Sequence, residues 1–76
     1  MQLRLGAHLA WYVPERVSTL RIDLAGPTPL RRVAEGLNLP LGEIALVTVN
    51  DQLTPLDTAL VCDGDCVALY PAICAG

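Results

Sequence analysis

The 76 residues are enough for one domain, and a hydrophobic content of 53% predicts that this domain buries a genuine core. Charged residues make up 17% of the chain, with a net charge of -3 and a pI near 4.7. This acidic balance argues against binding to nucleic acid or to anionic membranes, because both require a surplus of Lys and Arg. It favours a protein partner with a basic docking face.

The cysteines and the N-terminus bear on the cellular compartment. Cys62, Cys66 and Cys74 form an odd set without regular spacing, which fits reduced thiols in the cytoplasm better than a disulfide framework. Together with His8 they make only a weak zinc pattern, so we predict neither a disulfide nor a bound metal. Residues 1–16 lack the continuous apolar run of a signal peptide, and no segment has the roughly 20 apolar residues of a membrane span.

Two stretches near the N-terminus alternate apolar and polar residues with the period of half-buried strands. They cover residues 1–5 and 19–24. Residues 6–18, which include Gly6 and Pro14, supply a broad connection between them. The simplest prediction is an antiparallel hairpin.

The next stretch has the pattern of a short helix. "GPTP" interrupts the strand pattern, and we predict that Thr28 caps the helix and that Pro29 occupies its first position. An apolar stripe then recurs at i, i+3, i+4 and i+7, with charged residues on the other face. The stripe consists of Leu30, Val33, Ala34 and Leu37, opposite Arg31, Arg32 and Glu35. The helix is predicted to end near Leu37.

The second half of the chain contains two further strand patterns. "EIALVTVN" is apolar on both faces, as in an interior strand, and a turn at "NDQ" follows it. "LTPLDTAL" indicates an edge piece and a loop. After a turn at Asp63-Gly64-Asp65, the last strand should point Val67 and Leu69 into the core, and Pro71 should end its pairing.

This order of elements predicts an α+β fold with a mixed sheet of four to five strands packed on one helix. A right-handed helical crossover favours parallel placement of the first and last strands. That is the β-grasp, or ubiquitin-like, arrangement. It forms a single domain over residues 1–76, with a flexible tail over about 71–76 projecting from the sheet.

The residues of the chain do not assemble an active site. His8 is the only histidine and has no triad-like context, and the glycines form no phosphate-binding loop. Asp63 and Asp65 flank a turn glycine and are expected to be solvated. Trp11 and Tyr12 fit either an aromatic binding patch or a connection folded onto the core. The remaining candidate is the C-terminal end, which is uncharged after Asp65 and finishes on glycine.

The segment "VNDQLTPLDTALVCDGDCVALYPAICAG", residues 49–76, resembles the closing half of the ubiquitin-like sulfur carriers. These are the small subunit of molybdopterin synthase and the thiamine-biosynthesis carrier. In those families a "VN" strand end precedes a loop, "DGD-x-V" opens the last strand, a "P-P/A-V/I" step follows, and the chain stops at Gly-Gly. "GPTPLRRVAEGLNLP" is similar to their "G-x-T-V-x-x-L" helix entry. The likeness covers most of the chain, and its last third is distinctive.

The resemblance implies that the carboxylate of Gly76 is adenylated by a ubiquitin-activating-type enzyme and converted to a thiocarboxylate. The sulfur would pass to a biosynthetic enzyme such as the large subunit of a molybdopterin synthase. The protein would then be a carrier and substrate or a small subunit of a sulfur-transferring complex, not a catalyst. It would bind no cofactor stably, and ATP would be used by the activating enzyme. "YPAICAG" is nearer to the molybdopterin type than to the thiamine type.

The tail has one departure from the family, because Ala75 stands where the family has glycine. If the bound tail needs φ > 0 at this position, the Cβ costs about 1–2 kcal/mol. Cys74 is expected to be a small apolar tail residue, although a thiol there could also capture an activated acyl group.

We predict that Leu69, Tyr70 and Ile73 form part of a docking surface beside the tail, with core packing as the alternative for Leu69. The alternative to a sulfur carrier is a β-grasp binding module or protein modifier that uses its sheet face without sulfur transfer.

Overall fold

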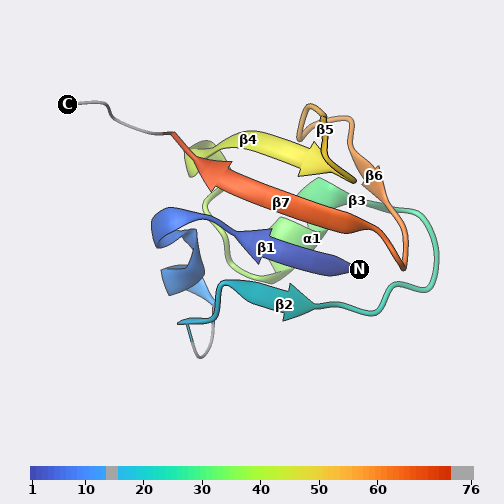
Figure 1. Cartoon of the computed structure of the whole chain (residues 1–76), viewed down its shortest axis with the longest axis horizontal. Coiled ribbons are helices and arrows are strands. Elements are labelled where there is room, and N and C mark those ends of the chain that lie inside the picture. The colour runs from blue at the N-terminus through green and yellow to red at the C-terminus, as the bar shows by residue number, and fades with distance from the viewer. Residues whose placement is uncertain (14–15, 73–76) are drawn as a thin grey trace.

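The computed structural model describes residues 1–13 and 16–72 (Figure 1). In chain order the elements are β1 (Gln2–Leu5), the 3-10 helix η1 (Ala7–Tyr12), β2 (Thr19–Arg21), β3 (Thr28–Pro29), α1 (Leu30–Gly36), the 3-10 helix η3 (Leu41–Glu43), β4 (Ile44–Val49), β5 (Gln52–Leu53), β6 (Leu60–Val61) and β7 (Cys66–Pro71).

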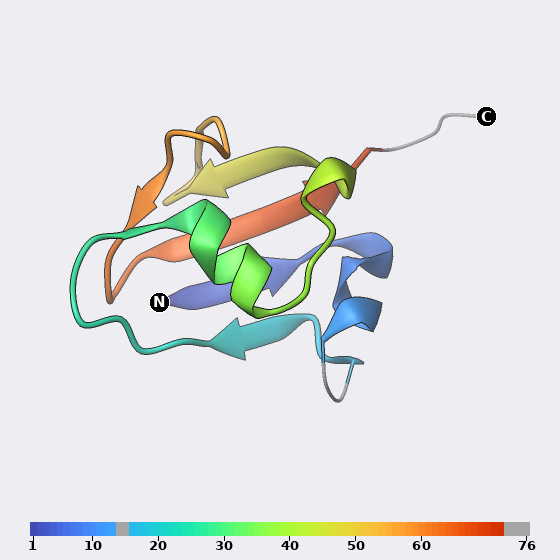
Figure 2. The same cartoon turned by 180° about the vertical axis from the view of Figure 1, so that it is seen from behind.

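The main sheet is mixed and has the strand order β2-β1-β7-β4-β5. β1 pairs with β2 in an antiparallel hairpin and with β7 in parallel, while β4 runs antiparallel to both β7 and β5. Both the predicted hairpin and the predicted parallel pairing of the first and last strands are therefore confirmed. Figure 2 shows α1 lying across one face of this sheet. The fold is the β-grasp arrangement that the sequence predicts.

The core lies between α1 and the sheet face that it covers. Val67 and Leu69 of β7 point into it, as predicted, and α1 contributes Leu30 and Ala34. The largest fully buried side chains are Leu3, Leu9, Leu30, Leu69, Val61 and Val67. Each is worth about 1.5–3 kcal/mol of burial free energy, and two of them, Val67 and Leu69, anchor the central strand β7 to the core.

The start of α1 corrects the predicted cap. Thr28 and Pro29 form β3, which pairs with β6, and the helix begins only at Leu30. The Thr28 hydroxyl donates to the Gly26 carbonyl at 3.0 Å instead of capping the helix, and the Leu30 N–H donates to the Ala59 carbonyl at 3.0 Å. The predicted cap is wrong because the Ala59 carbonyl, next to β6, accepts from the backbone N–H of Leu30 at the start of the helix. The Thr28 side chain is therefore not needed there.

The ends of three elements also bear on the predictions. α1 ends at Gly36 with Leu37 as its C-cap, close to the predicted position. Strand β2 stops at Arg21, three residues short of the predicted stretch. Pro71 belongs to β7, where it is buried and pairs with Ile44, so the segment after the strand begins at Ala72 and not at 71.

Strand β4 occupies the predicted interior position, between β7 and β5. Its two faces differ, because α1 covers only one side of the sheet. Val47 is buried against the core, whereas Leu46 on the other face is exposed. No helix within the described residues is long and apolar enough to cross a membrane.

Candidate functional site at the C-terminal end of β7

The C-terminal end of β7 is held on both sides. The Gly6 N–H, just after β1, donates to the Leu69 carbonyl at 2.8 Å, and on the other side Ile44 of β4 pairs with Pro71. The chain therefore leaves the sheet from a fixed point in its centre. Four of the predicted functional residues lie outside the described residues, namely Ile73, Cys74, Ala75 and Gly76.

Two predicted docking residues lie within β7 and have opposite environments. Leu69 is fully buried, with 0% exposure, so its assignment to a docking surface is wrong and it is a core residue. The alternation of a strand explains this, because Leu69 follows Val67 on the inward face. Tyr70 points to the outer face and is 37% exposed. Its direct cross-strand neighbour Leu46 is 44% exposed, and no sequence pattern distinguishes it from the other apolar residues of β4.

Gly6 makes room for the Tyr70 ring. A Cβ at Gly6 would lie 2.5 Å from Tyr70 Cδ1 and 3.1 Å from its Cε1. Gly6 itself is in an extended conformation, with φ of -82°, so close approach and not positive φ is what requires glycine here. The connection after β1 therefore packs directly on the exposed side chain nearest the end of β7.

A polar cluster joins η1 to η3 at the same end of the fold. The Glu43 carboxylate accepts a hydrogen bond from the Tyr12 hydroxyl at 2.8 Å and contacts His8 Nε2 at 3.0 Å. The bond from Tyr12, followed by that from His8, lowers the pKa of Glu43, and the same Tyr12 bond raises the pKa of Tyr12. Because His8 and Glu43 are 35 residues apart, the sequence carried no signal for this contact.

The cluster holds η1 and η3 together through the Glu43 carboxylate. The hydrogen bonds among the described residues do not connect His8 to a Ser, Thr or Cys nucleophile. Tyr12 is tied to η3 through its hydroxyl group. Trp11, in contrast, is 72% exposed.

The motif residues shared with the sulfur carriers fix two turns at the opposite end of β7. The Asn50 side chain accepts from the Cys66 N–H at 3.0 Å and donates to Asp65 at 3.1 Å. The other Asp65 oxygen accepts from the Cys62 N–H at 2.8 Å. Gly64 has a φ of +98°, which explains the glycine of the "DGD" turn. These residues stabilise the turns that lead into and face the start of β7.

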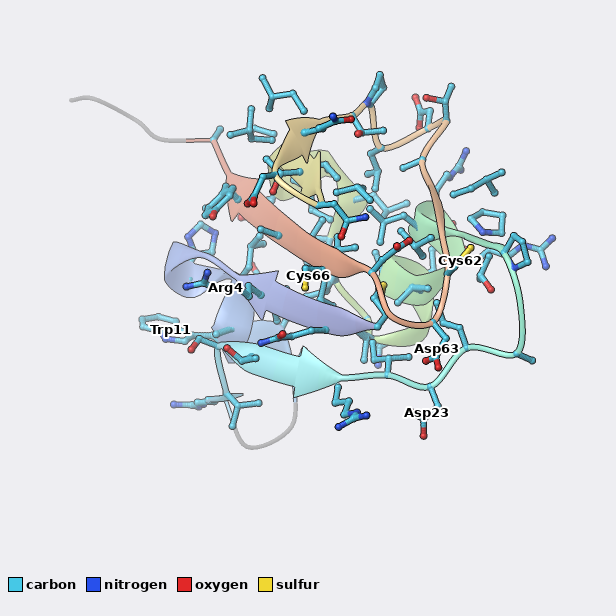
Figure 3. All side chains as sticks on the ribbon, turned by 45° about the vertical axis from the view of Figure 1, so that its right-hand side comes forward. Arg4, Trp11, Asp23, Cys62, Asp63 and Cys66 are labelled. Atoms are coloured by element: carbon cyan, nitrogen blue, oxygen red, sulfur yellow. The ribbon has the colours of Figure 1, made fainter. Side chains whose placement is uncertain are left out.

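The two cysteines within the described residues are free thiols on the surface, Cys62 after β6 and Cys66 at the start of β7 (Figure 3). Cys66 Sγ lies 3.9 Å from Gln2 Oε1. In the described part of the chain, no three His, Cys, Asp or Glu side chains lie close enough together to hold a metal ion. Cys74, the third member of the predicted set, lies outside it.

One helix packed on a mixed sheet with parallel first and last strands defines a ubiquitin-like protein. The family model described as Mut7-C ubiquitin matches residues 1–75, and the chain therefore belongs to that family. This match confirms the ubiquitin-like family that the motifs indicated. A search of curated proteins found no match.

Proposed function

We propose that the protein is a cytoplasmic sulfur carrier whose C-terminal Gly76 is adenylated and then converted to a thiocarboxylate for cofactor biosynthesis, molybdopterin synthesis being favoured over thiamine. The observation that carries the proposal is the way the sheet holds the C-terminal end of β7. The central strand is held on both sides up to Pro71, and the residues that follow are uncharged and lead to glycine. In this proposal, the sheet holds the end of β7 in place, and the Gly76 carboxylate is available to an enzyme.

The chemistry requires two displacements on the tail. A Gly76 carboxylate oxygen attacks the α-phosphorus of ATP and pyrophosphate leaves, giving an acyl adenylate. Hydrosulfide then attacks the acyl carbon, AMP leaves with the bridging oxygen, and a proton passes to solvent. The product is the thiocarboxylate. The activating enzyme catalyses the adenylation, while the carrier supplies an acyl carbon that has no neighbouring side chain.

Amino-acid composition supports sulfur transfer over chain-forming protein modification. All five of the residues counted as Lys or Arg are arginines, so the sequence contains no lysine. A second copy of the chain therefore offers no ε-amine to an activated tail. Lysine-linked chains of this protein are excluded on chemical grounds.

The proposed partners are a ubiquitin-activating-type adenylating enzyme and a sulfur-accepting biosynthetic enzyme, such as a molybdopterin synthase large subunit. Tyr70 and Leu46 form an apolar pair on the outer sheet face next to the end of β7, and we propose that they, with Ile73, contact the activating enzyme. Tyr70→Asp should weaken that binding by at least about tenfold. Unchanged binding would remove Tyr70 from the interface.

Adenylation is tested by ATP–pyrophosphate exchange with the adenylating enzyme encoded in the same genome. The full chain should support exchange, and a variant lacking Gly76 should not, although its circular dichroism and melting temperature are unchanged. Equal exchange with the shortened chain would contradict the proposal.

The exposed sheet face favours one alternative, a β-grasp binding module without sulfur transfer. Leu46 and Tyr70 would then bind a partner irrespective of the tail. Deleting Gly76 distinguishes the two functions. A binding module still binds its partner without Gly76 and loses this binding on Tyr70→Asp. A carrier loses its activity when Gly76 is deleted.

A further inference from the structure

The connection between β1 and β2 is longer than the hairpin requires. Antiparallel neighbours can be joined by two residues, but here residues 6–18 intervene and include η1. Leu9, Ala10 and Val13 are buried in the core. They anchor η1 and its C-cap to the domain, so η1 is a packed element of the fold.

The outer side of η1 is anchored as well. Glu43 holds Tyr12 at 2.8 Å and His8 at 3.0 Å, and the His8 and Tyr12 rings meet edge to face with centroids 6.2 Å apart. In the sequence, Trp11 lies between His8 and Tyr12. The backbone that carries Trp11 is therefore fixed from both sides.

Despite this anchoring, the Trp11 side chain is directed into solvent. At 72% exposure it is the most exposed large apolar side chain among the described residues. The recorded hydrogen bonds of the described residues do not include its indole N–H. A rigidly held and exposed tryptophan is the kind of residue that dominates binding energy at protein interfaces.

The position of Trp11 identifies the partner that can reach it. η1 begins directly after Gly6, whose N–H donates a hydrogen bond to the Leu69 carbonyl and whose Cα packs against the Tyr70 ring. Figures 1 and 2 place η1 and the C-terminal end of β7 at the same end of the molecule, and Figure 3 shows Trp11 pointing outward there. An enzyme that takes hold of the C-terminus has to approach this end.

We propose that Trp11 is a docking anchor for the adenylating enzyme, and that His8, Tyr12 and Glu43 hold η1 in position for it. The inference rests on the proposed carrier function. The matching site on the enzyme is an apolar pocket that accepts an indole and offers a hydrogen-bond acceptor to its N–H. A basic residue at the rim of that pocket complements the Glu43 carboxylate.

The chain has a single tryptophan, so the contact can be observed without mutation. Protein labelled with 5-fluorotryptophan gives one fluorine resonance, which reports only on Trp11. On titration with the adenylating enzyme encoded in the same genome, this resonance should shift and broaden to saturation. The binding curve gives Kd independently of any reaction.

Trp11→Ala should raise both Kd and the KM for the carrier in pyrophosphate exchange by at least about tenfold, with kcat unchanged. Leu53→Ala is the matched control, because Leu53 is 71% exposed and lies on β5, at the other end of the molecule in Figure 1. It should leave Kd and KM unchanged. Trp11→Phe should recover part of the loss.

Two results would overturn the inference: a fluorine resonance that does not move at saturating enzyme, or a Trp11→Ala variant with the Kd and KM of the parent. Either can occur while the parent protein is adenylated normally, so the carrier function would survive. If the carrier function itself is wrong, the parent protein supports no pyrophosphate exchange, and this result distinguishes the two failures.

Discussion

Gly6 is the residue on which the geometry at the end of β7 most depends. Gly6→Ala would place a methyl group against the Tyr70 ring, at distances of 2.5 and 3.1 Å from two of its carbons. We expect a loss of about 1–3 kcal/mol in the free energy of unfolding, together with a displaced Tyr70.

Gly26→Ala is the control for this change, because a Cβ there meets nothing within 4 Å. Urea denaturation of both variants compares the two costs. Equal stability of the two variants would show that the Tyr70 ring moves aside freely and that Gly6 does not fix it.

Ala75 is the residue at which the tail departs from the Gly-Gly ending of the resembling carriers. If the activating enzyme binds the tail with φ > 0 at this position, Ala75→Gly removes a penalty of about 1–2 kcal/mol. The kcat/KM of adenylation should then rise by about five- to thirtyfold. A rate unchanged by Ala75→Gly would mean that the enzyme binds an extended tail.

At the scale of elements, the β4–β5 turn depends on Asn50. The turn has two residues, Asn50 and Asp51, with φ of 52° and 69°, as a type I′ hairpin requires. Asn50→Ala should cost about 2 kcal/mol, since it combines the left-handed backbone penalty with the loss of two hydrogen bonds.

Two variants separate these contributions. Asn50→Gly removes only the hydrogen bonds and should cost about 1 kcal/mol. Asp51→Ala keeps the left-handed backbone and removes a side chain that has no recorded hydrogen bond to the described residues. Thermal unfolding of the three proteins measures the differences, and an Asn50→Gly variant as unstable as Asn50→Ala would contradict this division.

Asp65, in the turn before β7, makes the stability of the fold depend on pH in the acidic range. The Cys62 N–H, followed by the Asn50 amide, lowers the pKa of Asp65. A lowered folded-state pKa contributes stability that is complete above the ordinary aspartate pKa of about 3.9 and is lost as pH falls through the folded value. We expect the melting temperature to fall below about pH 4, and Asp65→Asn to make this fall shallower. An unaltered acid limb in Asp65→Asn would contradict this assignment.

Periodic elements were predictable from the sequence, and contacts between distant residues were not. The alternation around Leu3 and Leu69 and the stripe that includes Leu30 determine which side chains face the core. A two-residue strand such as β3 is too short to show any period, so the sequence pattern predicts a helix cap at Thr28 instead of a strand.

At the candidate site, too, the sequence pattern predicts residues within one strand but not contacts between distant residues. Tyr70 was found from its place at the end of the last strand, whereas Glu43 and Leu46 emerge only once the fold brings them beside η1 and β7.

The whole molecule is an acidic domain whose conspicuous motif residues serve the fold. Asn50, Gly64 and Asp65 fix turns at one end of β7, while the opposite end carries Tyr70 and the uncharged tail. A carrier needs this separation, because the enzyme must grip the tail without disturbing the turns that keep the sheet together. The resemblance to sulfur carriers therefore rests on fold-determining residues, and tail chemistry has to be measured directly.

The intact mass of the protein shows whether its terminal carboxylate becomes a thiocarboxylate. The purified chain is weighed before and after incubation with the adenylating enzyme, ATP and sulfide, which also establishes whether Gly76 ends the chain. We expect a gain equal to the exchange of one oxygen for one sulfur, which should be absent without ATP and absent when Gly76 is deleted. A folded protein whose mass stays unchanged with an enzyme that binds it would contradict the carrier function and leave the binding module.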